Sequence, residues 1–137
     1  MDRFLYKWSY TSKQPLVKFR AHENCINSIT VLNDFRIATC CQNAVLKLWS
    51  GSLLGNQPLS VYTHKFPLWS LCATKNFLLS GDVEGFISYH CLDTLEVKKT
   101  IKAHTSGIFM MKGYEGTLEK TFTTSSEDFK AKAWTLL

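Results

Sequence analysis

The sequence has 137 residues, 45% hydrophobic and 20% charged, a composition typical of one folded domain rather than a disordered chain. Its five cysteines include no C-x-x-C pair and its start lacks a secretory pattern, which argues against a secreted disulfide scaffold and predicts an intracellular protein of the cytoplasm or nucleus. No apolar run approaches the ~18 residues of a membrane span, so no membrane insertion is expected. The net charge of +5 allows an acidic or RNA partner without requiring one.

In chain order, the first expected strands are residues 2–9, which contain the closing pair Trp8-Ser9, and residues 16–19. The next unit alternates β-branched and polar residues and contains two short turns, Asn33-Asp34 and Gln42-Asn43. This pattern predicts four antiparallel strands, over residues 26–32, 35–40, 44–49 and 59–62.

Two further units repeat this plan. The first has expected strands over residues 68–73, 77–81, 85–90 and 97–101, and the second over residues 108–112, 121–124 and 129–134. An insertion over residues 113–120 is expected to enlarge the first turn of the last unit. No helical period competes with the strand pattern, so the fold is predicted to be all-β.

Two markers recur with a common period. Trp8, Trp49, His90 and Trp134 each end a strand, at steps of 41, 41 and 44 residues. A histidine precedes each of the three units, at steps of 42 and 40: His22, His64 and His104. A period of ~40–45 residues indicates β-propeller blades.

At the level of motifs, the chain resembles the WD-repeat family of β-propellers. The family opens a blade with Gly-His and closes its third strand with Trp-Asp, where this chain has Ala21-His22, Thr63-His64 and Ala103-His104, then Trp8-Ser9, Trp49-Ser50, His90-Cys91 and Trp134-Thr135. Six residues before each closing position stand Asp2, Asn43, Glu84 and Asp128, and four residues before those last three stand Thr39, Ser80 and Thr124.

The resemblance implies a hydrogen-bonded structural network inside each blade, with members His22, Thr39, Asn43 and Trp49, then His64, Ser80, Glu84 and His90, and then His104, Thr124, Asp128 and Trp134. The carboxylate is expected to accept from the imidazole and from turn amides. Only the last set matches the family fully. Because His90 replaces a large aromatic ring, the middle blade is expected to be the least stable.

The resemblance also implies a domain organisation. Residues 1–137 are expected to form a single WD-repeat domain. Within it, residues 1–19 supply the outer strands of a preceding blade, residues 20–62 and 63–102 form blades, and residues 103–137 form a blade without its own fourth strand.

A propeller ring has ~4–8 blades, so this ring is expected to be incomplete. Three alternatives remain open. The chain is a piece of a longer propeller, it completes a ring with another chain or by self-association, or it folds alone as an open stack.

A catalytic or metal-binding role for these histidines, hydroxyls and acids is less well supported than a structural one. The histidine, hydroxyl and acid sets recur in three blades, whereas an enzyme needs one active site, and the spacing of histidines and cysteines matches no metal motif. We therefore expect no catalytic residue, cofactor or metal.

The family resemblance implies a protein-interaction scaffold, as a subunit or fragment of a larger assembly, with other proteins as partners, one of which can supply the missing blades. The alternative is an RNA-associated component, suggested by the lysines. Residues expected to face a partner are Gln42, Val83, Glu127, Asn24, Cys25, Phe66, Pro67, Ser106 and Gly107.

Overall fold

The computed structural model describes residues 2–53, 55–115 and 120–135 of the chain. All regular structure in these residues is β-strand, in agreement with the all-β prediction. They contain no helix that could cross a membrane.

In the described part of the chain, thirteen strands form four antiparallel sheets. The first sheet has two strands, β1 (Phe4–Lys7) and β2 (Val17–Arg20). The second consists of β3 (Ile26–Val31), β4 (Ile37–Cys41), β5 (Val45–Trp49) and β6 (Ser60–Thr63). The third consists of β7 (Leu68–Ala73), β8 (Leu78–Asp82), β9 (Phe86–His90) and β10 (Val97–Lys102). The fourth has three strands, β11 (Ile108–Glu115), β12 (Lys120–Ser126) and β13 (Ala131–Thr135).

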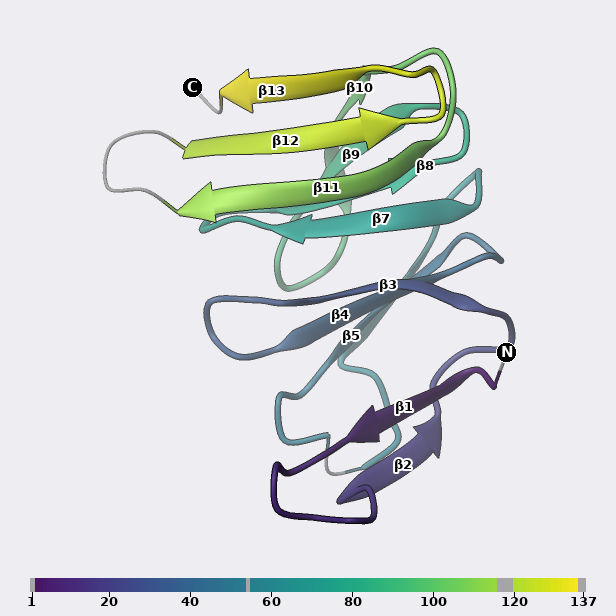
Figure 1. Ribbon diagram of the computed structural model, residues 1–137, viewed down its shortest axis with the longest axis vertical. Coiled ribbons are helices and arrows are strands. Elements are labelled where there is room, and N and C mark those ends of the chain that lie inside the picture. The colour runs from purple at the N-terminus through teal and green to yellow at the C-terminus, as the bar shows by residue number, and fades with distance from the viewer. Residues whose placement is uncertain (1, 54, 116–119, 136–137) are drawn as a thin grey trace.

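The sheets follow one another along the molecule in sequence order, from β1–β2 near the N-terminus to β11–β13 near the C-terminus (Figure 1). In each sheet the strands pair in chain order, and the inner strands β3, β7 and β11 lie next to one another. Within the described residues the four sheets do not close into a ring, in agreement with the expected incomplete propeller.

The expected insertion at residues 113–120 has a different structure from the one predicted. Residues 113–115 continue β11 and residue 120 begins β12, so the hairpin becomes longer rather than its loop larger. Residues 116–119 lie outside the described part of the chain. The register pairs Gly113 with Phe122 and Glu115 with Lys120. The strand pattern therefore runs through the segment that was predicted to be a turn.

One turn position has the same backbone conformation in all four sheets. Arg3, Ala44, Gly85 and Phe129 have φ angles of 62°, 63°, 84° and 64°. This left-handed region favours glycine, yet only Gly85 has no side chain. A Cβ atom on Gly85 would lie 2.3 Å from the backbone oxygen of His104, so this turn also needs glycine for space.

Three apolar clusters hold the sheets together. The cluster between the second and third sheets includes Leu46, Leu48, Leu68 and Leu78, all 0% exposed. The cluster between the third and fourth sheets includes Leu79, Ile87, Ile108, Met111 and Phe122. Because both clusters use residues of β7–β10, this middle sheet is covered on both faces.

Coverage is poorer at the N-terminal end, where a third cluster joins the first two sheets through Leu5, Trp49 and Leu53. The position on the inner strand opposite the network hydroxyl is occupied by Ile29, Leu71 and Met111 in successive sheets. Leu71 and Met111 are 5% and 6% exposed, whereas Ile29 is 56% exposed. The sheet before Ile29 has only two strands, which leaves this side chain in water.

Candidate functional site

The last sheet has a complete network of the predicted residues. The Trp134 indole N–H donates to Thr124 Oγ1 at 3.0 Å, and Thr124 Oγ1 lies 2.8 Å from His104 Nε2. His104 Nδ1 lies 3.0 Å from an Asp128 carboxylate oxygen, which also accepts from the Thr105 amide. Burial raises the pKa of Asp128, but these hydrogen bonds and the Lys130 amide outweigh it and lower the pKa to about 2.

The second sheet has the indole, hydroxyl and imidazole of this network, but its turn residue does not take part. Thr39 Oγ1 accepts from the Trp49 indole N–H at 2.8 Å and lies 2.7 Å from His22 Nε2. Asn43 does not reach the imidazole, because its amide oxygen accepts from the Asn24 amide instead. His22 Nδ1 is buried with no hydrogen-bond partner, and burial, with the nearby Lys47 charge, lowers the pKa of His22 to about 4.

The middle sheet differs from the prediction at the turn acid. The exposed Glu84 carboxylate lies outside the network, and the buried Asp82 takes the place at the turn. The Asp82 carboxylate accepts from the amides of Glu84 and Phe86 at 3.0 and 2.9 Å. Burial raises the pKa of Asp82 despite these two bonds. Asp82 ends β8, two residues before the position that the motif spacing indicates.

His90 reverses the direction of the hydrogen bonds in this sheet. Its Nδ1 lies 2.7 Å from the Leu95 carbonyl oxygen, which can only accept, so neutral His90 carries its proton on Nδ1. Its Nε2 must then accept, from the Ser80 hydroxyl at 2.8 Å and from His64 Nε2–H at 3.2 Å. Trp49 and Trp134 donate to a hydroxyl, whereas His90 accepts from one.

Sequence reasoning missed Leu95, which has φ 61° and is fully buried. Leu53 has φ 55° at the matching turn of the preceding sheet and is also buried. Both side chains pack under the turn after the third strand of their sheet. A leucine recurring after 42 residues was the available sequence signal.

The predicted partner-facing residues meet in pairs at one end of the sheets. The turn amides of Gln42, Val83 and Glu127 donate to the carbonyl oxygens of Cys25, Pro67 and Gly107, at 3.0, 3.1 and 2.9 Å. Ser106 adds a hydroxyl bond to the Glu127 carboxylate, and Asn24 bonds to Asn43. Gly107 is the one residue of this predicted set that is buried, because it packs against the Trp69 ring.

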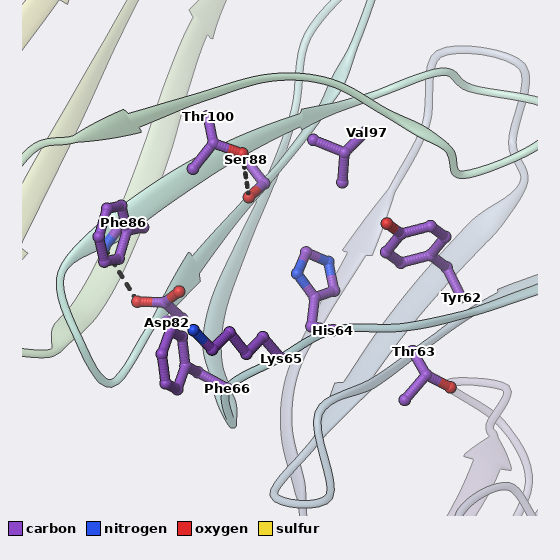
Figure 2. Close-up of a pocket in the computed structure, with 10 residues that line it drawn as sticks. All are labelled: Tyr62, Thr63, His64, Lys65, Phe66, Asp82, Phe86, Ser88, Val97 and Thr100. Atoms are coloured by element: carbon purple, nitrogen blue, oxygen red, sulfur yellow. Dashed lines mark hydrogen bonds between the residues drawn. The ribbon is translucent and has the colours of Figure 1, made fainter.

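A pocket of about 360 Å³ opens beside this end, between β6 and the outer strands β9 and β10. Figure 2 shows His64 pointing into the middle of the pocket, with Phe66, Phe86 and Asp82 around it. The Phe66 and Phe86 rings are stacked with centroids 6.5 Å apart. Lys65 and Lys102 each hold an ammonium over one ring, at 5.0 and 4.4 Å from the centroid.

The titratable groups of the pocket favour binding over proton chemistry. Burial, together with the adjacent His90, lowers the pKa of His64 to about 4, so its imidazole is neutral near pH 7. Within residues 2–53, 55–115 and 120–135, no group of three or more histidine, cysteine or acidic side chains could hold a metal ion. The arrangement offers two aromatic faces, two cations and a neutral imidazole.

The five cysteines are free thiols. Burial raises the pKa of Cys72 to about 11 and also raises that of Cys40. These two side chains belong to apolar clusters, which fits a packing role better than redox chemistry.

Comparison with known proteins supports the fold. A family model for the WD domain, G-beta repeat, matches residues 13–50. No curated protein sequence matches the chain. A computationally designed protein, Ika8, has a TM-score of 0.78 at 18% identity over 98% of this chain and 41% of its own.

Two natural propeller structures are also similar. The WD40 beta propeller domain of Doa1 has a TM-score of 0.69 at 22% identity, over 82% of this chain and 38% of its own. The RRP9 WD40 repeats have a TM-score of 0.74 at 19% identity, over 85% of this chain and 37% of their own. The chain thus spans about two fifths of each of these three structures.

Proposed function

We propose that this chain, which carries a WD repeat and has the fold of an incomplete WD40 propeller, is a non-catalytic protein-interaction module of a larger assembly. WD40 propeller domains generally mediate protein–protein interactions, and residues 13–50 match their family model. A rigid stack of sheets that presents loops at one end suits this role.

The pocket between β6 and β9–β10 is the observation that carries this proposal. Its stacked Phe66 and Phe86 rings offer an apolar platform, and the ammonium groups of Lys65 and Lys102 lie over those rings. Such a site favours a partner segment with an apolar anchor next to a carboxylate. The buried Asp82 also lines the pocket, and its Oδ1 accepts from the turn amides of Glu84 and Phe86.

Affinity enrichment with quantitative mass spectrometry tests this function. Replacing Phe66 with serine removes half of the ring pair, and we expect the proteins enriched with the wild-type chain to fall at least about fivefold. Phe35→Ser is the matched control, because Phe35 is 78% exposed at the turn between β3 and β4. Unchanged enrichment with Phe66→Ser, in a variant that still unfolds cooperatively, would contradict the assigned surface.

RNA association is the second candidate, since the formal net charge is +5 and Lys18 lies 5.1 and 5.4 Å from the Phe4 and Tyr6 ring centroids. Aromatic rings beside lysines can stack unpaired bases. A filter-binding titration should then show affinity for a single-stranded RNA that falls steeply with salt. Lys18→Gln should weaken it more than the exposed control Lys98→Gln, and no binding at low salt removes this candidate.

A further inference from the structure

The histidine in the middle of the pocket between β6 and β9–β10 has a fixed proton position. The Leu95 carbonyl oxygen accepts from His90 Nδ1–H at 2.7 Å, so neutral His90 has no proton on Nε2. His64 Nε2 lies 3.2 Å from this bare nitrogen. A hydrogen bond between the two nitrogens needs one proton, which His64 must therefore supply. Neutral His64 carries its proton on Nε2 and has a lone pair on Nδ1.

The lone pair on His64 Nδ1 is open to the pocket. The imidazole is held edge to face against the Tyr62 and His90 rings, with centroids 5.1 and 4.8 Å away. Among the described residues, His22 Nδ1 is the one buried side-chain nitrogen or oxygen without a hydrogen-bond partner. His64 Nδ1 has no partner there either, so it is accessible to solvent, and Figure 2 shows its ring in the middle of the pocket. A ligand thus meets a hydrogen-bond acceptor at the centre of the site.

Two hydroxyl groups on the β9–β10 wall offer the opposite function, a hydrogen-bond donor. Ser88 Oγ and Thr100 Oγ1 lie 3.2 Å apart, and both residues line the pocket. Their mutual bond uses one of the two hydroxyl protons and leaves the other for a ligand. A ligand hydroxyl both donates and accepts, so it matches His64 and this pair. An indole N–H only donates, and a phenyl ring does neither.

The remaining walls favour an aromatic ring beside an acid. The Phe66 and Phe86 rings are nearly parallel, at 7°, and offer a flat apolar surface. The Lys65 ammonium lies 5.0 Å from the Phe66 centroid, and in the described part of the chain it forms no salt bridge. A carboxylate beside the bound ring can therefore pair with Lys65.

We propose that this pocket binds a tyrosine side chain of a protein partner, next to an aspartate or glutamate of the same segment. The ring packs against Phe66 and Phe86, the hydroxyl donates to His64 Nδ1, and the carboxylate pairs with Lys65. The inference rests on the proposed interaction function of this pocket and adds the residue type that the pocket selects. A phosphorylated tyrosine does not fit, because its phosphate has no hydroxyl proton to give to Nδ1 when fully ionised.

Two synthetic peptides, acetyl-Glu-Tyr-Glu-amide and acetyl-Glu-Phe-Glu-amide, are the probes. Each has a carboxylate on both sides of the ring, and they differ only in the hydroxyl. NMR titration of the full chain should show saturable binding, about fivefold tighter for the tyrosine peptide. Lys65→Gln should weaken both peptides by about the same factor, roughly threefold. The control Lys98→Gln, at an exposed position outside the pocket, should change neither affinity.

NMR spectra of the histidine ring nitrogens test the hydrogen bond itself. His64 Nδ1 should carry no proton at pH 7, and its nitrogen signal should shift with the tyrosine peptide but not with the phenylalanine peptide. His64→Leu removes the acceptor and should reduce the preference for tyrosine to less than about twofold. Thermal unfolding verifies that this variant is folded, and the two comparisons on the wild-type chain do not depend on it.

Four results would each overturn the proposal. They are a proton on His64 Nδ1, equal affinity for the two peptides, tighter binding when the tyrosine is phosphorylated, and no binding by either peptide. None of them decides whether the chain is an interaction module, because enrichment with Phe66→Ser measures that with natural partners. The two proposals therefore fail separately.

Discussion

The β3–β6 and β11–β13 sheets combine network and coverage in opposite ways. In β3–β6 the network is incomplete, since His22 Nδ1 has no partner, yet Trp49 is only 2% exposed between two neighbouring sheets. In β11–β13 the network is complete, but among the described strands β13 pairs with β12 alone, and most of its residues are exposed. Packing and hydrogen bonding thus stabilise these two sheets by different means.

The middle sheet, β7–β10, also shows how coverage by neighbouring sheets bears on stability. The sequence predicts that β7–β10 is the least stable, because His90 replaces a tryptophan. The structure favours the opposite order, since His90 is fully buried, both its ring nitrogens are hydrogen-bonded, and the strands around it are covered on both faces. We therefore expect coverage by neighbouring sheets to outweigh the loss of one aromatic ring in the stability of this sheet. Hydrogen exchange that is faster in β8 than in β12 would restore the original expectation.

Trp49→Ala is the change with the largest expected effect. It removes a buried ring and the indole bond to Thr39, and should lower the free energy of unfolding by about 3–5 kcal/mol. Trp134→Ala removes the same chemistry from a partly buried site and should cost about half as much. Urea unfolding followed by circular dichroism compares the two. Equal losses would mean that coverage does not separate the sheets.

Acidification should act on the two sheets in different pH windows. His22 has a pKa of about 4 in the folded chain and 6.5 when unfolded. Between these values only the unfolded chain takes up the proton, so lowering the pH from 6.5 to 4 should reduce stability by about 2–3 kcal/mol.

In the last sheet, the Asp128 carboxylate loses its stabilising effect at a lower pH than His22 does. The folded pKa of Asp128 is lowered to about 2 from 3.8, so its stabilising contribution is lost only as the pH falls through that range. Hydrogen exchange at pH 7, 5 and 3.5, corrected for intrinsic rates, should show β3–β6 losing protection first. Simultaneous loss in both sheets at pH 5 would contradict this assignment.

Replacing Asp128 by Asn and Asn43 by Asp should reverse which of the two networks has a carboxylate beside its imidazole. Asp128→Asn removes the carboxylate from His104 and should cost about 1–2 kcal/mol. Asn43→Asp offers His22 the missing acceptor, keeps the bond from Asn24, and should add about 0.5–1 kcal/mol at pH 7. Thermal melts measure both. Asn43→Asp should also reduce the loss of stability between pH 6.5 and 4, and Asn43→Ser is the control that brings no carboxylate.

The smallest expected effect is at the left-handed turn position. Ala44→Gly and Phe129→Gly relieve backbone strain at φ 63° and 64°, and each should add about 0.5 kcal/mol after the entropy cost of glycine. Gly85→Ala is the opposite control and should be destabilising, since its Cβ has no space. A loss of stability in both glycine variants would show that the side chains at these turns contribute more than the strain costs.

The strands were predictable because alternation and turn residues act locally. The pattern placed β7 correctly at residues 68–73. It failed at residues 113–115, where the alternation simply continues, and at Asn43 and Glu84, because the reach of a side chain across a turn is not encoded in spacing. The sequence also does not predict that Ile29 is exposed whereas Leu71 is buried, because this difference depends on the neighbouring sheet. The partner-facing set stays a prediction, apart from the buried Gly107.

The strictly sequential pairing within each sheet also affects how the chain is made. Because β3 to β6 pair only with strands adjacent in the sequence, this sheet can assemble on the ribosome once residue 63 has emerged. Each later sheet then folds against a surface that already exists, which keeps the entropy of loop closure low.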